Sequence, residues 1–237
     1  MMRPLPESTA EALRLMPDVP LVRRSEASRW NVIDPLPATG SIGIELGVAA
    51  GSFSARMVQS GRFRLFYGVD AYSDGHGVRE YKAALRATGL MSDFRLLRMT
   101  FSQALDLFPD ASFDFIYVDG FAHTGCEGGR TLEDWFPKLK PGGIMAGDDY
   151  DLADWPLVVW AVHEAVAQIG GPLQIADQVS DQAYNRFPSW SFQRPQGGPD
   201  RLRFSARLRE VCDLEKARID QLRKEKRQQK QAKSGQR

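Results

Sequence analysis

The sequence predicts a doubly wound, Rossmann-like α/β domain, and two observations support this fold class. Between residues 41 and 147, five short apolar runs alternate with helix-like segments, which is the pattern of repeated βα units around a parallel sheet. The runs also lack a polar–apolar alternation, as expected for strands that helices cover on both faces.

The expected elements follow one another in a regular order. The strands are SIGIELG, RLFYGVD, FRLLRM, FDFIYVD and GIMAGDD, and the helices between them are SFSARMVQSG, REYKAALRATG, FSQALDLF and GGRTLEDWFPKLKPGG. A long helix, WPLVVWAVHEAVAQIGG, comes next. LQIADQ and WSFQRP are weaker strand candidates, which we expect to pair antiparallel as the last two strands.

Both ends of the chain differ from this core. Residues 1–39 contain six prolines and predict a helical cap, with one helix over residues 7–16 and a second in RRSEASRWNVI. Residues 40–198 form the main domain. Residues 199–237 predict a charged helical tail with a thin apolar stripe and a disordered end; the stripe consists of Leu208, Val211, Leu214 and Leu222.

The overall composition limits the class of protein. The 237 residues carry a formal net charge of +1, so no global basic field indicates a nucleic-acid partner. Cys126 and Cys212 are too few for a disulfide framework, which favours free thiols in a reducing cytoplasm. No apolar stretch approaches the roughly 20 residues of a membrane span. We therefore expect a cytoplasmic protein.

A glycine-containing loop follows the first expected strand, in IELGVAAGSFS. Gly47 permits a tight turn, Gly51 allows a close backbone approach to a ligand, and a helix begins near Ser52 with free N–H groups. The loop reads E-x-G-x-x-x-G, unlike the dinucleotide pattern G-x-G-x-x-G. Glu45 would repel a pyrophosphate but attract an ammonium group, which favours a nucleoside amino acid as the ligand.

Two later strand ends suit the nucleoside part of such a ligand. Asp70 ends the second strand, where a carboxylate can accept both ribose hydroxyls. In RMTFSQAL, either Thr100 or Ser102 can cap the short helix, and Ser102 is our candidate for the adenine edge.

Three carboxylates end the next two strands. Asp119 follows the fourth strand, and Asp148 and Asp149 follow the fifth, so parallel neighbours would bring them together. Such close carboxylates share a proton or bind a cation, and oxygen ligands suit Mg²⁺. The alternative is that Asp148 or Asp149 caps the next helix and only Asp119 is functional.

The three histidines differ in whether a functional or a structural role is expected for them. His123 lies in a glycine-rich loop four residues after Asp119 and could act as a general base. His76 follows Asp70 near the mouth of the predicted site, whereas His163 lies inside an apolar helix and is expected to be structural.

Together, ELGVAAGSFS, GVDAYSD and FDFIYVDGFAHTGCEGGRTLEDWFPKLKPGGIMAGDDYD resemble class I S-adenosylmethionine-dependent methyltransferases. They look most like small bacterial enzymes that methylate hydroxyls of sugars or other small molecules. The resemblance covers roughly residues 40–171. It implies a seven-stranded sheet with its last strand antiparallel.

The resemblance also implies roles for particular residues. Glu45, Gly47 and Gly51 would surround the methionine end of the cofactor, Asp70 the ribose and Ser102 the adenine. We add Ser52, Ala71 and Asp119 to the predicted cofactor-binding residues. In metal-dependent relatives, the carboxylates that match Asp119, Asp148 and Asp149 hold Mg²⁺, which lowers the pKa of the acceptor hydroxyl. Metal-free relatives use a histidine in the region of His123, so the catalytic candidates are Asp119, His123 and Asp148.

Alternatives to a small-molecule O-methyltransferase remain at this point. One is an NAD-dependent oxidoreductase, against which the E-x-G-x-x-x-G loop and the acidic cluster argue. Another is a non-catalytic relative that binds the cofactor, or a partner through its tail. The residues name no methyl acceptor, and the apolar stripe of the tail is too thin to decide for or against a homodimer.

Overall fold

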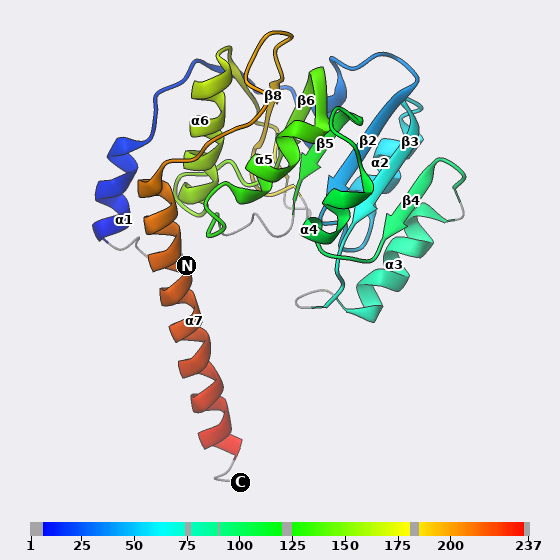
Figure 1. Ribbon diagram of the computed structural model, residues 1–237. Helices are drawn as coiled ribbons and strands as arrows, with labels where there is room; N and C mark the ends of the chain where they lie inside the picture. Colours follow the sequence, from blue (N-terminus) through cyan, green and yellow to red (C-terminus); the bar gives the residue numbers. More distant parts are fainter. Residues whose placement is uncertain (1–6, 74–76, 90, 120–124, 181–184, 235–237) are drawn as a thin grey trace.

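The computed structural model describes residues 7–73, 77–89, 91–119, 125–180 and 185–234. Its described residues form one mixed sheet in the order β1-β7-β8-β6-β5-β2-β3-β4 (Figure 1). The strands are β1 Leu21–Arg24, β2 Ser41–Leu46, β3 Phe63–Val69, β4 Phe94–Leu97, β5 Phe113–Val118, β6 Leu139–Gly147, β7 Leu173–Ala176 and β8 Ser189–Gln193. Only β8 runs antiparallel to its neighbours β6 and β7. The predicted fold class is therefore confirmed.

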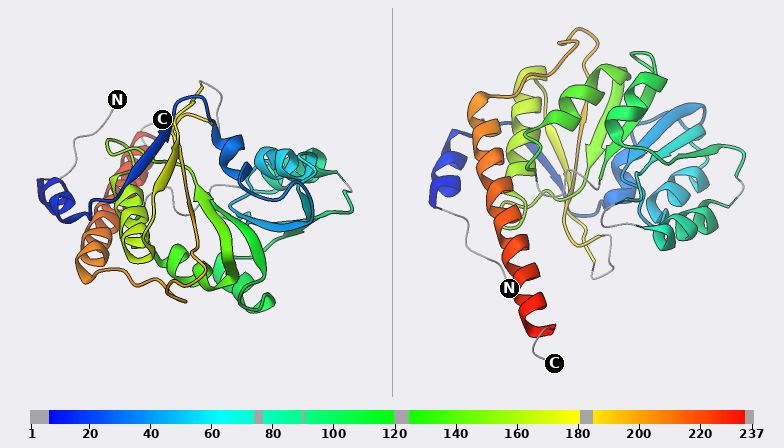
Figure 2. Two further views of the ribbon diagram at one scale, coloured as in Figure 1. Left: turned by 90° about the horizontal axis from the view of Figure 1, so that it is seen from above. Right: turned by 60° about the horizontal axis from the view of Figure 1, so that its bottom comes forward.

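Helices cover both faces of this sheet (Figure 1, Figure 2). The α-helices are α1 Glu7–Ala12, α2 Ser52–Gln59, α3 Val78–Thr88, α4 Phe101–Ala104, α5 Arg130–Trp135, α6 Pro156–Ile169 and α7 Ala206–Ser234. Short 3-10 helices are η1 Leu13–Leu15, η2 Arg29–Ile33, η3 Leu105–Leu107 and η5 Phe136–Lys138.

The alternate residues of β5 show why the apolar runs do not alternate in polarity. Phe115 and Tyr117 pack with η2 and α2 in one buried cluster. Ile116 and Val118 point the other way, into the larger cluster formed with α5, α6 and the start of α7. Both faces of the central strand are therefore buried, as expected for a covered parallel sheet.

The N-terminal segment differs from the predicted helical cap. Leu21–Arg24 forms an eighth strand, β1, which pairs in parallel with β7 at the edge of the sheet. The helix predicted in RRSEASRWNVI is reduced to the 3-10 helix η2, because Arg23 and Arg24 belong to the strand. A four-residue edge strand next to prolines has too little apolar pattern to be detected in the sequence.

The C-terminal helix α7 has two different parts. Leu208, Val211 and Cys212 are at most 2% exposed and pack on the main core. Leu214, at 58% exposed, points away from that core, and the rest of α7 projects beyond the body of the molecule (Figure 1). The helix extends to Ser234, further than the apolar stripe predicts.

Candidate functional site

Four acidic residues lie at the carboxyl edge of the sheet. Glu45 is the last residue but one of β2, while Asp70, Asp119 and Asp148 directly follow β3, β5 and β6. Since β3, β2, β5 and β6 are consecutive neighbours and parallel, their carboxyl ends meet at one edge. Ligands of open α/β sheets bind at such an edge.

Asp70 shapes the glycine-containing loop after β2. Its Oδ2 accepts hydrogen bonds from the backbone N–H groups of Val48 (3.1 Å) and Ala49 (2.9 Å). Its Oδ1 accepts one from the N–H of Tyr72 (2.8 Å). Asp70 is 7% exposed, and its hydrogen bonds connect the ends of β2 and β3. The ribose role predicted for it stays a prediction.

The loop glycines serve the backbone in different ways. Gly47, with a φ of +102°, makes the turn after β2 and donates its N–H to the carbonyl of Val69 (2.8 Å). Gly51 has a φ of +81°, and a Cβ there would lie 2.9 Å from the Cα of Ala84. The close approach at Gly51 is therefore between α2 and α3, a role that the sequence did not predict. As predicted, α2 begins at Ser52.

Glu45 lies deeper than expected for a residue that attracts a ligand. It is 1% exposed and accepts a hydrogen bond from the Ser54 hydroxyl. Burial raises the pKa of this carboxyl well above its ordinary value, although Ser54 and Arg29 act in the opposite direction. Glu45 thus lies buried beneath the loop and not at its surface.

Arg29, from η2, reaches the two carboxylates that end β5 and β6. Its Nη2 lies 3.2 Å from Asp119 Oδ2 and 2.9 Å from Asp148 Oδ2, and its side chain is 2% exposed. Burial opposes the charge of the guanidinium, but Tyr117, Asp148 and Asp119 outweigh it and raise the Arg29 pKa. Arg29 therefore remains a cation between two carboxylates.

Three aromatic rings surround this guanidinium. Its Cζ lies 4.9 Å from the ring centroid of Phe53 and 5.4 Å from the centroids of Trp30 and Tyr117. Phe53 and Tyr117 also stack on each other, with centroids 3.9 Å apart. A desolvated cation over aromatic faces gains roughly 2 kcal/mol or more from such contacts, so Arg29 is fixed by rings and carboxylates together.

Asp148 is the most strongly bonded member of this cluster. Its Oδ1 accepts hydrogen bonds from the Ser189 hydroxyl (2.6 Å) and from the Tyr117 hydroxyl, and Trp190 Nε1 donates to its backbone carbonyl (2.9 Å). Burial raises the pKa of Asp148 to about 7, with Arg29 lowering it and Asp119 raising it. Burial thus works against the charged form of Asp148, while the ion pair with Arg29 favours it.

The three-carboxylate magnesium site does not form in the described part of the chain. None of the described His, Cys, Asp and Glu side chains come together as a group of three or more that could hold a metal. Arg29 joins Asp119 to Asp148, while Asp149 has a left-handed backbone, with φ of +64°. The charge that Mg²⁺ was expected to neutralise is thus balanced by an arginine from another part of the chain.

The remaining predicted residues either lie around this edge of the sheet or fall outside the residues that the structure describes. Thr100 caps α4 by accepting the Gln103 N–H (3.3 Å), and exposed Ser102 lies 3.2 Å from the Thr100 hydroxyl. Half-buried Ala71 follows Asp70. His76 and His123 lie outside the described residues. The roles predicted for Ser102 and Ala71 in cofactor binding stay predictions.

His163 has the structural environment predicted for it. Its Nε2 lies 2.8 Å from the Tyr150 hydroxyl, and its Nδ1 lies 2.8 Å from the carbonyl oxygen of Pro17. These partners correspond to a neutral ring that donates from Nδ1 and accepts at Nε2. His163 thereby connects α6 to the N-terminal segment.

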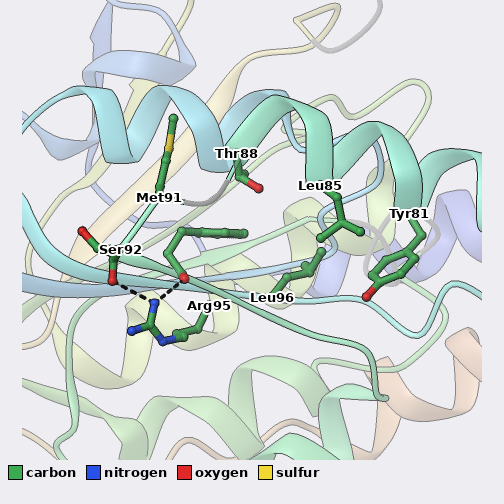
Figure 3. Close-up of a pocket in the computed structure, with 9 residues that line it drawn as sticks. Tyr81, Leu85, Thr88, Met91, Ser92, Arg95 and Leu96 are labelled. Atoms are coloured by element: carbon green, nitrogen blue, oxygen red, sulfur yellow. Dashed lines mark hydrogen bonds between the residues drawn. The ribbon is translucent and has the colours of Figure 1, made fainter.

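A separate hollow of about 350 Å³ lies between α3 and β4, at the outer edge of the sheet (Figure 3). Tyr81, Leu85 and Leu96 contribute to its wall, and Arg95 donates hydrogen bonds to the carbonyls of Ser92 (2.8 Å) and Phe94 (2.7 Å). It belongs to the β4 edge, so it is distinct from the carboxylate cluster at β5 and β6, and we assign no ligand to it.

Arg29 is the site residue that the sequence motifs missed. The motifs around Asp119 and Asp148 contain no cation close in sequence, and Arg29 lies 90 residues before Asp119. One signal was available, because adjacent buried carboxylates require a counter-charge. A search for that charge over the whole chain would have included Arg29, although nothing in RRSEASRWN singles it out from its neighbours.

Comparison with known proteins gives one family match. Residues 42–150 match a family model described as a methyltransferase domain. An uncharacterised protein, y4gI, of Sinorhizobium fredii is 36% identical over 75 residues, which cover 32% of this chain and 8% of that protein. The matched segment therefore covers less than a tenth of the length of this relative.

Comparison with solved structures gives matches at low identity. The N-methyltransferase NodS from Bradyrhizobium japonicum WM9 is 16% identical, with a TM-score of 0.50, over 80% of this chain and 95% of that one. A structure from Listeria monocytogenes, titled a putative S-adenosylmethionine-dependent methyltransferase, is 14% identical, with a TM-score of 0.40, over half of each chain. At these identities the likeness concerns the fold alone.

Proposed function

We propose that the chain, whose residues 42–150 match a methyltransferase domain, is a class I S-adenosylmethionine-dependent methyltransferase that methylates a hydroxyl oxygen of a small molecule or sugar. The cofactor, when bound, supplies an electrophilic methyl group on a sulfonium. The observation that carries the proposal is the convergence of Asp70, the glycine-containing loop and the Arg29–Asp119–Asp148 cluster at one sheet edge.

On the cofactor side, the loop geometry fits a nucleoside amino acid. Asp70 holds the loop through Val48 and Ala49, and the N-terminus of α2 lies directly after it, where N–H groups favour an anion. In our proposal, Gly47, Gly51 and Ser52 bind the methionine end and Asp70 binds the ribose. We further propose that Ala71 and Ser102 bind the adenine, and that buried Glu45 supports the loop from below.

On the acceptor side, Asp148 is our first candidate for the group that removes the hydroxyl proton. A general base works best when its pKa is near the operating pH, and the Asp148 pKa of about 7 meets this condition. Arg29 and Ser189 hold its two oxygens in place. His123 is the second candidate, and Asp119 orients the cluster through Arg29.

Magnesium does not fit this arrangement. A Mg²⁺ ion needs near-octahedral oxygen ligands at 2.0–2.1 Å, whereas a guanidinium lies between Asp119 and Asp148. We therefore include no metal in the proposed proton transfer, and the chain's own carboxylate takes the proton while the methyl group moves in line.

The cofactor part of the proposal is tested by calorimetric titration with S-adenosylhomocysteine and, separately, with NAD. We expect saturable binding of the former and none of the latter, and Asp70→Asn should weaken it by about tenfold, since a charged acceptor is worth roughly 1.5–3 kcal/mol. Saturable NAD binding without S-adenosylhomocysteine binding would overturn the proposal in favour of an oxidoreductase.

The reaction is tested by transfer of labelled methyl from S-adenosylmethionine to a panel of sugars, phenols and amines, with the products located by mass spectrometry. We expect an O-methyl product and full turnover in EDTA. Asp148→Asn should lower kcat by about 10²-fold or more with little change in cofactor affinity. If turnover is lost in EDTA and restored by Mg²⁺, a metal and not Asp148 activates the acceptor hydroxyl. If turnover collapses only in His123→Ala, His123 and not Asp148 is the general base.

A further inference from the structure

The charge of the chain is divided between two regions. Residues 216–237 contain nine Lys and Arg against two acids, a net charge of +7, while the whole chain carries +1. Residues 1–215 therefore carry a net charge of −6. The expectation of no nucleic-acid partner depends on the overall charge, which averages these two opposite regions.

Residues 216–234 of this positive region lie in α7. The helix is anchored by Leu208, Val211 and Cys212, and its C-terminal part extends beyond the body of the molecule (Figure 1, Figure 2). We call residues 216–234 the basic arm. Lys216, Lys224 and Gln228 are among its exposed residues, whereas Arg218, Ile219 and Leu222 are half-buried.

The end of the arm carries charges that repel one another, whereas nearer the body Asp220 stands four residues from both Lys216 and Lys224. Positions 223 and 227, 226 and 230, and 230 and 233 carry like charges three or four residues apart, a spacing that makes them neighbours on a helix and destabilises it. A single helix of this length is also marginal in water without packing. A polyanion would remove the repulsion and thereby stabilise the helix.

The composition of the arm distinguishes between polyanions. A helix that binds an anionic membrane buries an apolar face in the bilayer in addition to using its positive charge. The arm offers only Ile219, Leu222 and two alanines for such a face. Single strands are held by stacking on aromatic rings, and residues 205–237 contain no aromatic residue. The major groove of B-form DNA admits an α-helix, whereas that of an RNA duplex is too narrow. We propose that the basic arm binds the phosphate backbone of double-stranded DNA without reading its sequence.

The test uses the full chain and a fluorescent DNA duplex of mixed sequence, with binding followed by anisotropy. Between about 50 and 200 mM salt, we expect affinity to fall by roughly 10³-fold, as for proteins that neutralise six or more phosphates. Far-UV circular dichroism should show a gain in helix when the duplex is added.

A matched pair of variants assigns the binding to the arm. The arm variant carries Lys224→Gln, Lys226→Gln, Arg227→Gln, Lys230→Gln and Lys233→Gln. The control variant carries five changes at exposed positions of the body, Arg14→Gln, Arg56→Gln, Arg64→Gln, Lys82→Gln and Arg86→Gln. We expect the arm variant to lose at least about tenfold in affinity and much of the salt dependence. The control should change less than about threefold, because its charges lie away from the arm.

Three outcomes would overturn the proposal. The first is the absence of saturable duplex binding by the wild-type chain at about 50 mM salt. The second is an equal loss of affinity in both variants, which would place the contact elsewhere. The third is binding to phosphatidylserine vesicles that the duplex does not compete away, which would make a membrane surface the partner.

Discussion

The two ends of the chain both add elements to the seven core strands, but their environments are opposite. The N-terminal segment enters the fold, because β1 joins the sheet, Pro17 bonds to His163, and Arg29 reaches the carboxylates of the site. The C-terminal helix is anchored through one buried turn and then leaves the body. A few buried contacts join the N-terminal segment to the candidate site. The end of the C-terminal helix, in contrast, stays available to a partner.

The strongest way to test this comparison is to remove the buried charge of Arg29. Arg29→Met leaves Asp119 and Asp148 buried without their cation, which should cost about 3–5 kcal/mol in the free energy of unfolding. We expect a large loss of methyl transfer as well. Urea denaturation followed by fluorescence measures the first effect, and an unchanged midpoint would contradict the role of Arg29 in the fold.

A double variant separates charge from packing at this site. If the uncompensated carboxylates cause the loss, adding Asp119→Asn to Arg29→Met should recover part of the stability, since one buried charge is removed. If only the packing of Arg29 against the rings matters, the double variant should be no more stable than Arg29→Met.

The contact between His163 and the N-terminal segment should have the next largest effect. His163→Leu leaves the Pro17 carbonyl and the Tyr150 hydroxyl without this partner, at a cost of about 1–3 kcal/mol. Thermal unfolding measures the change, and Tyr150→Phe is the control that keeps the histidine and its bond to Pro17.

The same histidine predicts a pH dependence. Burial lowers the pKa of His163 below its ordinary value, with the Pro17 carbonyl acting in the opposite direction. The unfolded chain then binds a proton first, so stability should fall as the pH drops below about 6.5. In His163→Leu this part of the pH dependence should disappear. Identical pH profiles for both proteins would show that other groups control acid stability.

A surface contact of the same segment should matter much less. Arg23, on β1, pairs with Asp177 at 2.7 Å, and its side chain is 54% exposed. Exposed pairs contribute about 0–1 kcal/mol, so Arg23→Met should lie within that range. A loss comparable to that of Arg29→Met would mean that this surface ion pair, and not the buried groups, holds the segment on the body.

The contrast between local patterns and long-range contacts explains how much of the fold and of the candidate site could be predicted from the sequence. The strands from β2 to β6 begin roughly every 20 to 30 residues as short apolar runs, and an acid lies at or directly after the end of all of them except β4. Local patterns in the sequence therefore contain them. Strand β1 and Arg29 lack such a pattern: their partners are Leu173 and Asp148, more than 100 residues away. The role of Gly51 also depends on a distant residue, Ala84, and the pattern identified the glycine without identifying the neighbour.

The smallest effect is expected from removal of the end of α7. A chain that stops before Arg223 loses residues that bury no described apolar side chain in the core, so the free energy of unfolding should change by less than about 0.5 kcal/mol. Leu208→Ala, at the anchored turn of the same helix, is the control and should cost about 2–5 kcal/mol because that side chain is fully buried. The shortened chain should also keep its S-adenosylhomocysteine affinity and lose most of its affinity for the duplex. If the truncation instead lowers the melting temperature by more than a few degrees, the projecting helix packs on the body or on a second copy of the chain, and the contrast between the two ends would no longer hold.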